Sequence, residues 1–118
     1  MQAFLNEARS IIELRGVEYG FSFRRRPENM ATLRGLGWTV TQLVELILTL
    51  TVDSYSGNVD PTDTIPEDGW VFGVQEANMD IYIKLAIVRP PEGDVVVCVS
   101  FHESRWKLSY PYNSGCET

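Results

Sequence analysis

Hydrophobic residues near the start of the chain recur every three or four positions with polar residues between them, which is the spacing of an amphipathic helix. The apolar members of this pattern are Phe4, Leu5, Ala8, Ile11 and Ile12. Gly16 predicts the end of the helix, because glycine commonly terminates helices. The spacing then changes to strict alternation, at Val17, Tyr19, Phe21 and Phe23. Alternation predicts a strand with one buried face.

Two further helices are predicted in the first half of the chain. Pro27 suits the first turn of a short helix that runs to about Arg34, before the glycine-containing break at residues 35–37. Its inward residues are expected to be Met30 and Leu33. Thr39 and Gln42 then have the spacing of a capping box. The broad apolar stripe that follows predicts the most buried helix, with Val40, Leu43, Val44, Ile47 and Leu50 on its inner side.

The second half of the chain predicts a loop and then a sheet. Residues 54–68 follow neither period, which predicts a long loop, with one helical turn at residues 52–55. Loops of this length are often functional in compact domains. Apolar, β-branched runs then predict three strands, at residues 70–74, 81–88 and 95–102. Their short connections indicate antiparallel pairing. The aromatic tail, residues 106–112, is expected to cover the end of the sheet or to lie along its edge.

Together these elements predict an α+β fold in which N-terminal helices pack on an antiparallel sheet. The 118 residues, 44% of them hydrophobic, fit one domain spanning residues 1–118. No apolar run approaches the roughly 18 residues of a membrane span, and residues 1–16 do not have the pattern of a signal peptide. We therefore expect a cytoplasmic protein without membrane contact. Two cysteines, Cys98 and Cys116, and one histidine make a poor disulfide framework and a poor metal-ligand set, so we expect no metal and no cofactor.

The charge of the chain is negative and unevenly distributed. A net charge of −6 argues against nucleic-acid binding, because phosphate contacts require a positive surface. Residues 1–37, however, carry six arginines and four acidic residues, whereas residues 38–70 carry six acidic residues and no lysine or arginine. A locally positive site is therefore compatible with the sequence. Its candidate cations are Arg24, Arg25, Arg26, Lys84, Arg105 and Lys107.

The last predicted hairpin presents polar side chains on one face. Side chains alternate along a strand, so the core face is expected to hold Ile81, Ile83, Leu85 and Ile87 from one strand and Val95, Val97, Val99 and Phe101 from the other. The opposite, open face is then expected to hold Tyr82, Lys84, Cys98, Ser100 and His102. A symmetric turn places Tyr82 opposite His102 and Lys84 opposite Ser100, about 5.5 Å apart between Cβ atoms.

These side chains suit RNA cleavage by attack of the ribose 2′-hydroxyl on the adjacent phosphate, a reaction that uses a base, an acid and a cation. His102 can act as acid or base near neutral pH. Lys84 can stabilise the charge that develops on the phosphate, helped by Arg105 or by the arginines at residues 24–26. Aromatic side chains can stack an unpaired base or share a proton, and the candidates are Tyr82, Tyr110 and Tyr112.

Each feature also has an ordinary structural interpretation. A single histidine on a strand is more often a hydrogen-bonded structural residue, and a run of arginines is more often a solvated strand end. Cys98 is not expected to pair with His102, because four residues along one strand separate them by about 13 Å. The acidic residues of the 53–68 segment lack the spacing of a calcium-binding loop, which favours a solvated loop.

Four short motifs, in this order and spacing, resemble the motility quorum-sensing regulator (MqsR) toxin family. They are residues 48–55 (Leu-Thr-Leu-Thr-Val-Asp-Ser-Tyr), 70–73 (Trp-Val-Phe-Gly), 81–84 (Ile-Tyr-Ile-Lys) and 99–102 (Val-Ser-Phe-His). The resemblance implies a RelE-like fold, mRNA interferase activity and a cognate antitoxin protein that blocks it. It also implies roles in activity for Tyr82 and His102, and it adds Tyr55 to the candidate RNA contacts.

The chain departs from the best-known members of that family at three positions. Those members have lysine where His102 stands, lysine where Ser56 stands and glutamine where Val71 stands, and they are basic rather than acidic. Two functions therefore stay open. The first is a metal-independent endoribonuclease toxin that cleaves mRNA with His102, Tyr82 and Lys84, where Ser100 would contact the RNA. The second is a non-catalytic protein-binding module with the same fold. The oligomeric state is left open.

Overall fold

A computed structural model describes residues 1–56, 69–105 and 107–112. The helices are α1 (Gln2–Gly20), α2 (Pro27–Leu36) and α3 (Val40–Leu48), followed by a short 3-10 turn, η1 (Val52–Ser54). The strands are β1 (Phe21–Phe23), β2 (Tyr55–Ser56), β3 (Trp70–Glu76), β4 (Met79–Val88) and β5 (Val95–Glu103). The predicted α+β class is confirmed. Within the described ranges, no helix is long and apolar enough to cross a membrane.

The five strands form one sheet in the order β1-β5-β4-β3-β2. The three strands predicted from the sequence are antiparallel neighbours as expected, because β4 pairs antiparallel with both β3 and β5. At the two edges of the sheet, neither the strand β2 nor the pairing of β1 was predicted. The short strand β2 pairs antiparallel with β3, and β1 pairs parallel with β5. The sheet is therefore mixed, with its antiparallel part at the predicted strands.

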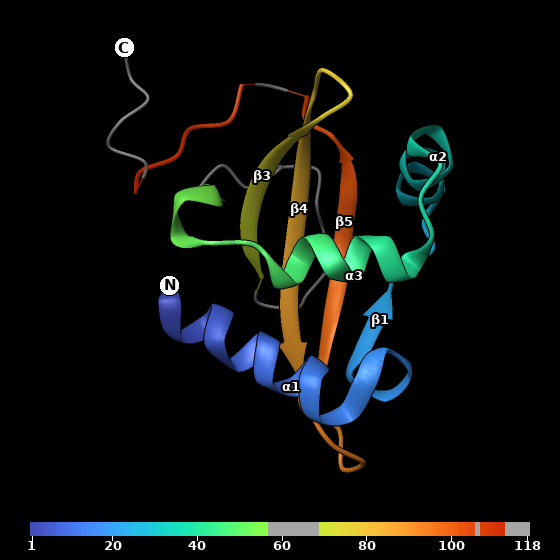
Figure 1. Cartoon of the computed structure of the whole chain (residues 1–118), viewed down its shortest axis with the longest axis vertical. Helices are drawn as coiled ribbons and strands as arrows, with labels where there is room; N and C mark the ends of the chain where they lie inside the picture. Colours follow the sequence, from blue (N-terminus) through green and yellow to red (C-terminus); the bar gives the residue numbers. More distant parts are fainter. Residues whose placement is uncertain (57–68, 106, 113–118) are drawn as a thin grey trace.

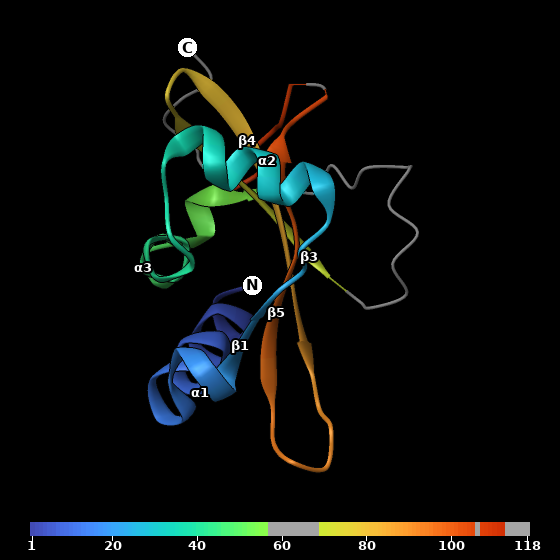
Figure 2. The ribbon, with the colours of Figure 1, turned by 90° about the vertical axis from the view of Figure 1, so that its right-hand side faces the viewer.

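Helices cover one face of the sheet, so that the core lies between two layers. In Figure 1 α1 and α3 cross in front of the strands, and in Figure 2 both lie to one side of the sheet. The predicted inner sides of these helices are confirmed, because they bury Leu5, Ala8, Ile11, Ile12, Leu43, Val44 and Ile47. The predicted capping box is also present, since the Thr39 N–H donates to Oε1 of Gln42 at 2.8 Å. The third helix, α2, lies beside the end of β5, beyond β1.

The strand predicted from residue 17 is wrong over its first half. Gly16 has a φ of 79° and kinks α1, but the helix continues to Gly20 instead of ending there. Val17 and Tyr19 therefore lie on the protein surface, and Tyr19 is 66% exposed. Only Phe21–Phe23 form the strand. A single helical turn after a kink is too short to show a period of its own, so the alternation of apolar residues was misleading.

A β-bulge in β5 changes the face to which its first half points. Lys84 pairs with Ser100. The next residue, Leu85, pairs with Cys98, so Val99 is an extra residue in β5. The residues before the bulge that enter the core beneath the helices are Val96 and Cys98, and those in the cluster on the other face are Val95, Val97 and Val99. The predicted core face is wrong for this half of β5, because a bulge shifts the alternation by one residue.

Candidate active site on the outer face of the sheet

The outer face of the sheet, turned away from α1 and α3, carries two neighbouring cross-strand pairs of polar residues on β4 and β5. We call Tyr82, Lys84, Ser100 and His102 the polar cluster. The predicted register is confirmed: Tyr82 pairs with His102 and Lys84 pairs with Ser100. The rings of Tyr82 and His102 are stacked, with centroids 5.2 Å apart and an interplanar angle of 13°. The bulge at Val99 lies next to the Lys84–Ser100 pair, on the side of the connection between β4 and β5.

The polar cluster is buried, whereas an open face was predicted. His102 is 6% exposed, Lys84 5%, Tyr82 1% and Ser100 1%. Alternation shows which side chains share a face but does not show whether a later segment covers that face. One such cover is the tail, which we define as residues 107–112.

The tail packs on the outer face over β3 and β4. Leu108, which is 4% exposed, forms a small apolar cluster with Val71 and Tyr82, against which Tyr110 also packs. Gly73 makes room for this contact. A Cβ atom there would lie 2.4 Å from the Tyr110 hydroxyl oxygen and 2.6 Å from a methyl carbon of Leu108. The tail was predicted to cover the end of the sheet or to lie along its edge, whereas Leu108 and Tyr110 pack on its outer face. Trp106 lies outside the described residues.

His102 has a defined hydrogen-bond geometry. Its Nδ1 lies 3.0 Å from the backbone carbonyl oxygen of Glu103. A carbonyl can only accept a hydrogen bond, so this contact places the proton of a neutral ring on Nδ1. Nε2 then has a free lone pair and can take a proton from another group.

Ser56 and Val71 continue the row that contains Lys84 and Ser100. Ser56 pairs with Val71, and Val71 pairs with Lys84. The two positions at which the resembling family has lysine and glutamine therefore adjoin the polar cluster. Gly69 borders the same row, because a Cβ atom there would lie 2.4 Å from Cε of Lys84. The aliphatic part of the lysine is packed against the backbone at Gly69.

The arginines predicted to bind RNA are largely engaged in structural contacts. The Arg24 backbone N–H donates to the carbonyl of Cys98 at 3.0 Å, which extends the pairing of β1. The guanidinium of Arg25 lies 5.9 Å from the centroid of the Phe23 ring on the helix side. Arg105 forms an ion pair with Glu28 of α2. Neither Arg25 nor Arg105 is brought to the polar cluster by these contacts.

The remaining predicted RNA contacts lie in two places. Arg26 and Tyr110 lie near the outer face, and Tyr55 and Tyr112 lie at the β2 edge of the sheet. Arg26 Nη1 donates to the Val99 carbonyl at 3.4 Å, at the bulge. Tyr110 lies over Gly73. Tyr55 packs with Tyr112 at the β2 edge, with ring centroids 5.7 Å apart, and Tyr112 is 54% exposed. Of these aromatic residues only Tyr110 packs against the polar cluster.

Asn29 is a fully buried polar residue that the sequence did not single out. Its Nδ2 donates to the carbonyl of Arg24 at 2.8 Å and to that of Val99 at 3.1 Å, and its Oδ1 accepts the Phe101 N–H at 2.9 Å. No local pattern marks such a residue, because its partners in β5, Val99 and Phe101, are 70 and 72 positions away. Gly73, by contrast, could have been found, since a glycine within a strand pattern indicates a close approach of another segment.

Cys98 lies in the core instead of the outer face, which corrects the prediction. Burial raises the pKa of its thiol, because the thiolate would lose its hydration in an apolar environment. The thiol is 0% exposed and donates toward the Ser100 carbonyl at 3.5 Å. It therefore stays protonated and is not available as a nucleophile.

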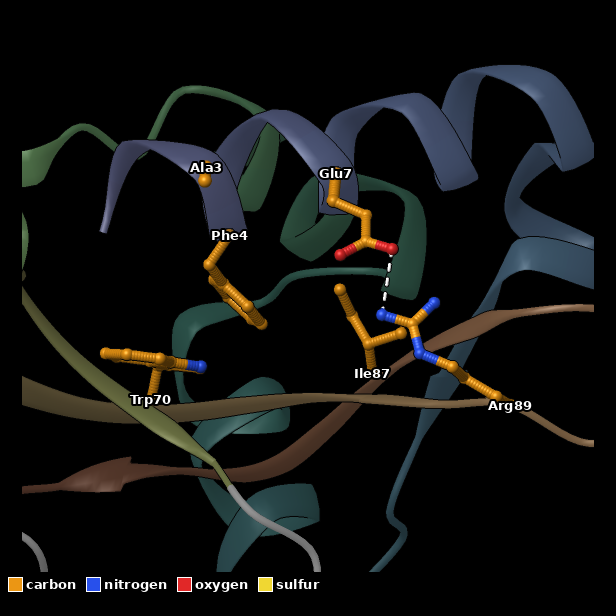
Figure 3. A pocket seen from close by; sticks show the side chains of 6 residues that line it. All are labelled: Ala3, Phe4, Glu7, Trp70, Ile87 and Arg89. Carbon is orange, nitrogen blue, oxygen red and sulfur yellow. Dashed lines mark ion pairs between the residues drawn. The ribbon is translucent and has the colours of Figure 1, made fainter.

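A separate pocket of about 360 Å³ lies on the other side of the sheet, between α1 and the strands β3 and β4. Figure 3 shows the rings of Phe4 and Trp70 at one end and the Glu7–Arg89 ion pair at the other. The ion-pair distance is 2.8 Å, and Trp70 is 39% exposed. The hydrogen bond and charge of Glu7 raise the pKa of Arg89, which stays positively charged.

Over the described ranges, no group of three or more histidine, cysteine, aspartate or glutamate side chains is arranged to hold a metal ion. The predicted loop at residues 54–68 lies largely outside those ranges, because residues 57–68 are not described. Comparison of the chain with protein-family models, with curated proteins and with solved structures finds no match. The resemblance to the MqsR family therefore stays a prediction from the sequence motifs.

Proposed function

We propose that this chain is a metal-independent endoribonuclease of the toxin type, which cleaves mRNA and is neutralised by a cognate antitoxin protein. The observation that carries the proposal is the stacked Tyr82–His102 pair beside the Lys84–Ser100 pair on one face of the sheet. These four side chains supply the proton-transfer groups and the cation that 2′-hydroxyl attack uses. The resemblance of the sequence motifs to the MqsR family supports the same activity and the cytoplasmic location.

Each residue of the polar cluster has a defined role in the proposed reaction. Nε2 of His102 accepts the proton of the attacking 2′-hydroxyl, because Nδ1 is held by the Glu103 carbonyl. The new bond joins the 2′-oxygen to phosphorus, and the bond from phosphorus to the 5′-oxygen breaks. The ammonium of Lys84 stabilises the negative charge on the phosphate oxygens. Tyr82 orients the imidazole by stacking and provides a hydroxyl for proton transfer to the leaving 5′-oxygen.

Burial of the polar cluster implies that the tail moves when RNA binds. Leu108 covers Tyr82, and a phosphate cannot reach His102 at its present exposure of 6%. The tail joins the sheet through residues after β5 and rests on β3 by side-chain contacts. Displacing these contacts uncovers Tyr82 without breaking any strand pairing of the sheet.

The test is incubation of the purified chain with a long RNA in EDTA, with mapping of the cuts and of their termini. We expect 2′,3′-cyclic phosphate ends, and a loss of about 100-fold or more in rate for His102→Ala. Tyr82→Phe keeps the stacked ring and tests the hydroxyl alone. Ser22→Ala, an exposed residue of β1, is the matched control. Cleavage by His102→Ala at the wild-type rate would remove the polar cluster as the active site.

A protein-binding module is the second candidate function, and the pocket in Figure 3 favours it. Trp70 is one of the few large apolar side chains left exposed, and it lies in a hollow that can accept a side chain of a partner. In that case RNA stays intact in the wild-type assay, with and without ribosomes. The product of an adjacent small reading frame would bind tightly, and Trp70→Ala would weaken that binding.

A further inference from the structure

The apolar run in the first half of β5 does not determine its own register. Residues 95–99 are Val-Val-Val-Cys-Val, so either set of alternate side chains is apolar and either set can face the core. Register is weakly specified where both faces are alike. Without the extra residue Val99, a regular ladder could keep only one half of β5 in its observed register with β4.

The two halves of β5 are held by different neighbours. The first half lies between two strands, because residues 96–98 pair with β1 and residues 95–98 pair with β4. The second half, from Ser100 to Glu103, pairs with β4 alone among the described strands. Its other support comes from α2. A loss of the bulge would therefore displace the second half, which carries His102.

Asn29 links α2 to the bulge and to the end of β1 through hydrogen bonds of its side chain. It accepts from the Phe101 N–H and donates to the Val99 carbonyl, the two backbone groups that flank Ser100. It also donates to the Arg24 carbonyl at the end of β1. Bulges leave backbone groups without ladder partners, and such groups are costly when buried. Asn29 satisfies them at a site where it is 0% exposed.

We propose that Asn29 is the positioning residue that fixes the bulge and thereby holds His102 opposite Tyr82. Sliding the second half of β5 by one residue would bring Phe101 opposite Tyr82 and turn His102 toward the core. Asn29 prevents this slide by holding the groups on both sides of Ser100. The catalytic consequence rests on the proposed function, whereas the structural consequence does not.

The structural consequence can be measured by NMR, because His102 is the only histidine of the chain. In the wild type, we expect the stacked Tyr82 ring to shift the His102 ring protons upfield. We expect Asn29→Ala to lose at least half of this shift while the cross-strand contact between Leu85 and Cys98 persists. Leu33→Ala is the matched control, since it removes a buried side chain of α2 that is apolar and makes no hydrogen bond to the bulge. It should retain both signals.

Deleting Val99 provides a rescue that a merely stabilising role for Asn29 does not predict. The deletion removes the extra residue, so Leu85–Cys98 and Lys84–Ser100 become successive pairs of a regular ladder. Asn29→Ala should then leave the His102 shift intact in the deletion background. In the proposed reaction, Asn29→Ala should lower kcat with little change in KM, and the deletion should restore kcat.

Each result supports or overturns the role of Asn29 separately from the function. A wild-type His102 shift in Asn29→Ala would overturn the positioning role even if RNA is cleaved. An absence of RNA cleavage in the wild type would overturn the proposed function and leave the NMR result standing. If Asn29→Ala does not fold, hydrogen exchange in the wild type decides. The Asn29 side-chain amide should exchange far more slowly than that of exposed Asn78, and equal rates would overturn the proposal.

Discussion

Replacing Gly73 by alanine tests whether the tail is the removable cover of the polar cluster. The added Cβ atom would lie 2.4 Å from the Tyr110 hydroxyl oxygen and 2.6 Å from a Leu108 methyl carbon. Gly73 pairs with Tyr82 of β4, and the preceding residue, Phe72, is paired with both β2 and β4, so β3 cannot easily yield. The ends of the Leu108 and Tyr110 side chains must therefore move away from β3, and a full displacement lifts the tail from the sheet.

The cost of lifting the tail can be worked from the side chain that it buries. Leu108 is 4% exposed, and full exposure of a leucine side chain costs about 1.5–3 kcal/mol. Tyr110 is half-buried and adds to this loss. For a chain of 118 residues, about 1 kcal/mol corresponds to about 4 °C in Tm. The variant should therefore melt below the wild type by up to about 6–12 °C, the value for a fully lifted tail, while it keeps its fold.

The accessibility of His102, the only histidine, can be measured as its rate of modification by diethyl pyrocarbonate, followed by mass spectrometry. We expect His102 to react slowly in the wild type and faster in Gly73→Ala. The matched control is Gly35→Ala in α2, where an added Cβ has nothing within 4 Å and no positive φ is required. That change should stabilise the protein by about 0.5–1 kcal/mol. An unchanged Tm together with unchanged His102 reactivity in Gly73→Ala would refute the cover.

Two other predictions concern the core. The pKa of the Cys98 thiol is raised in the folded state, so above its ordinary value of 9.0 the unfolded chain loses a proton that the folded chain keeps. The free energy of unfolding should fall by up to about 1.4 kcal/mol per pH unit from this group, and Cys98→Ala should flatten that dependence in urea unfolding at pH 9–11. Arg9 donates to the carbonyls of Leu48 and Leu50 after α3. Arg9→Met should reduce the free energy of unfolding by about 1.5–3 kcal/mol in the same assay, and a change below about 0.5 kcal/mol would mean that water replaces the guanidinium.

Local patterns predicted the parts of the fold that local forces determine. The capping residues of α3, the apolar sides of α1 and α3 and the three long strands follow from spacing alone. The pairing of Tyr82 with His102 was also predicted, but from a regular ladder, whereas in the structure the extra residue Val99 shifts the register by one between the connection and this pair. The elements and their apolar sides are therefore well placed by the sequence, whereas the bulge within β5 is not.

The remaining features depend on distant partners. The bulge at Val99 is supported by Asn29, which lies 70 residues away from it, so no window of sequence contains both. For the same reason the placement of Cys98 in the core was missed. Burial of the polar cluster depends on Leu108 reaching across to β3. For Cys98 and for the polar cluster, the sequence identified the side chains, and a long-range contact decided where they are buried.

The parallel pairing of β1 with β5 bears on the order in which the protein can fold during synthesis. Phe21 pairs with Val96, so 75 positions separate the two strands along the chain. While a ribosome builds the intervening residues, α1 and β1 have emerged without the strand that covers Phe21 and Phe23. Contacts of such long range are slow to form and leave apolar surface open to wrong partners. We therefore expect the nascent chain to bind a chaperone through residues 1–23 until β5 leaves the exit tunnel.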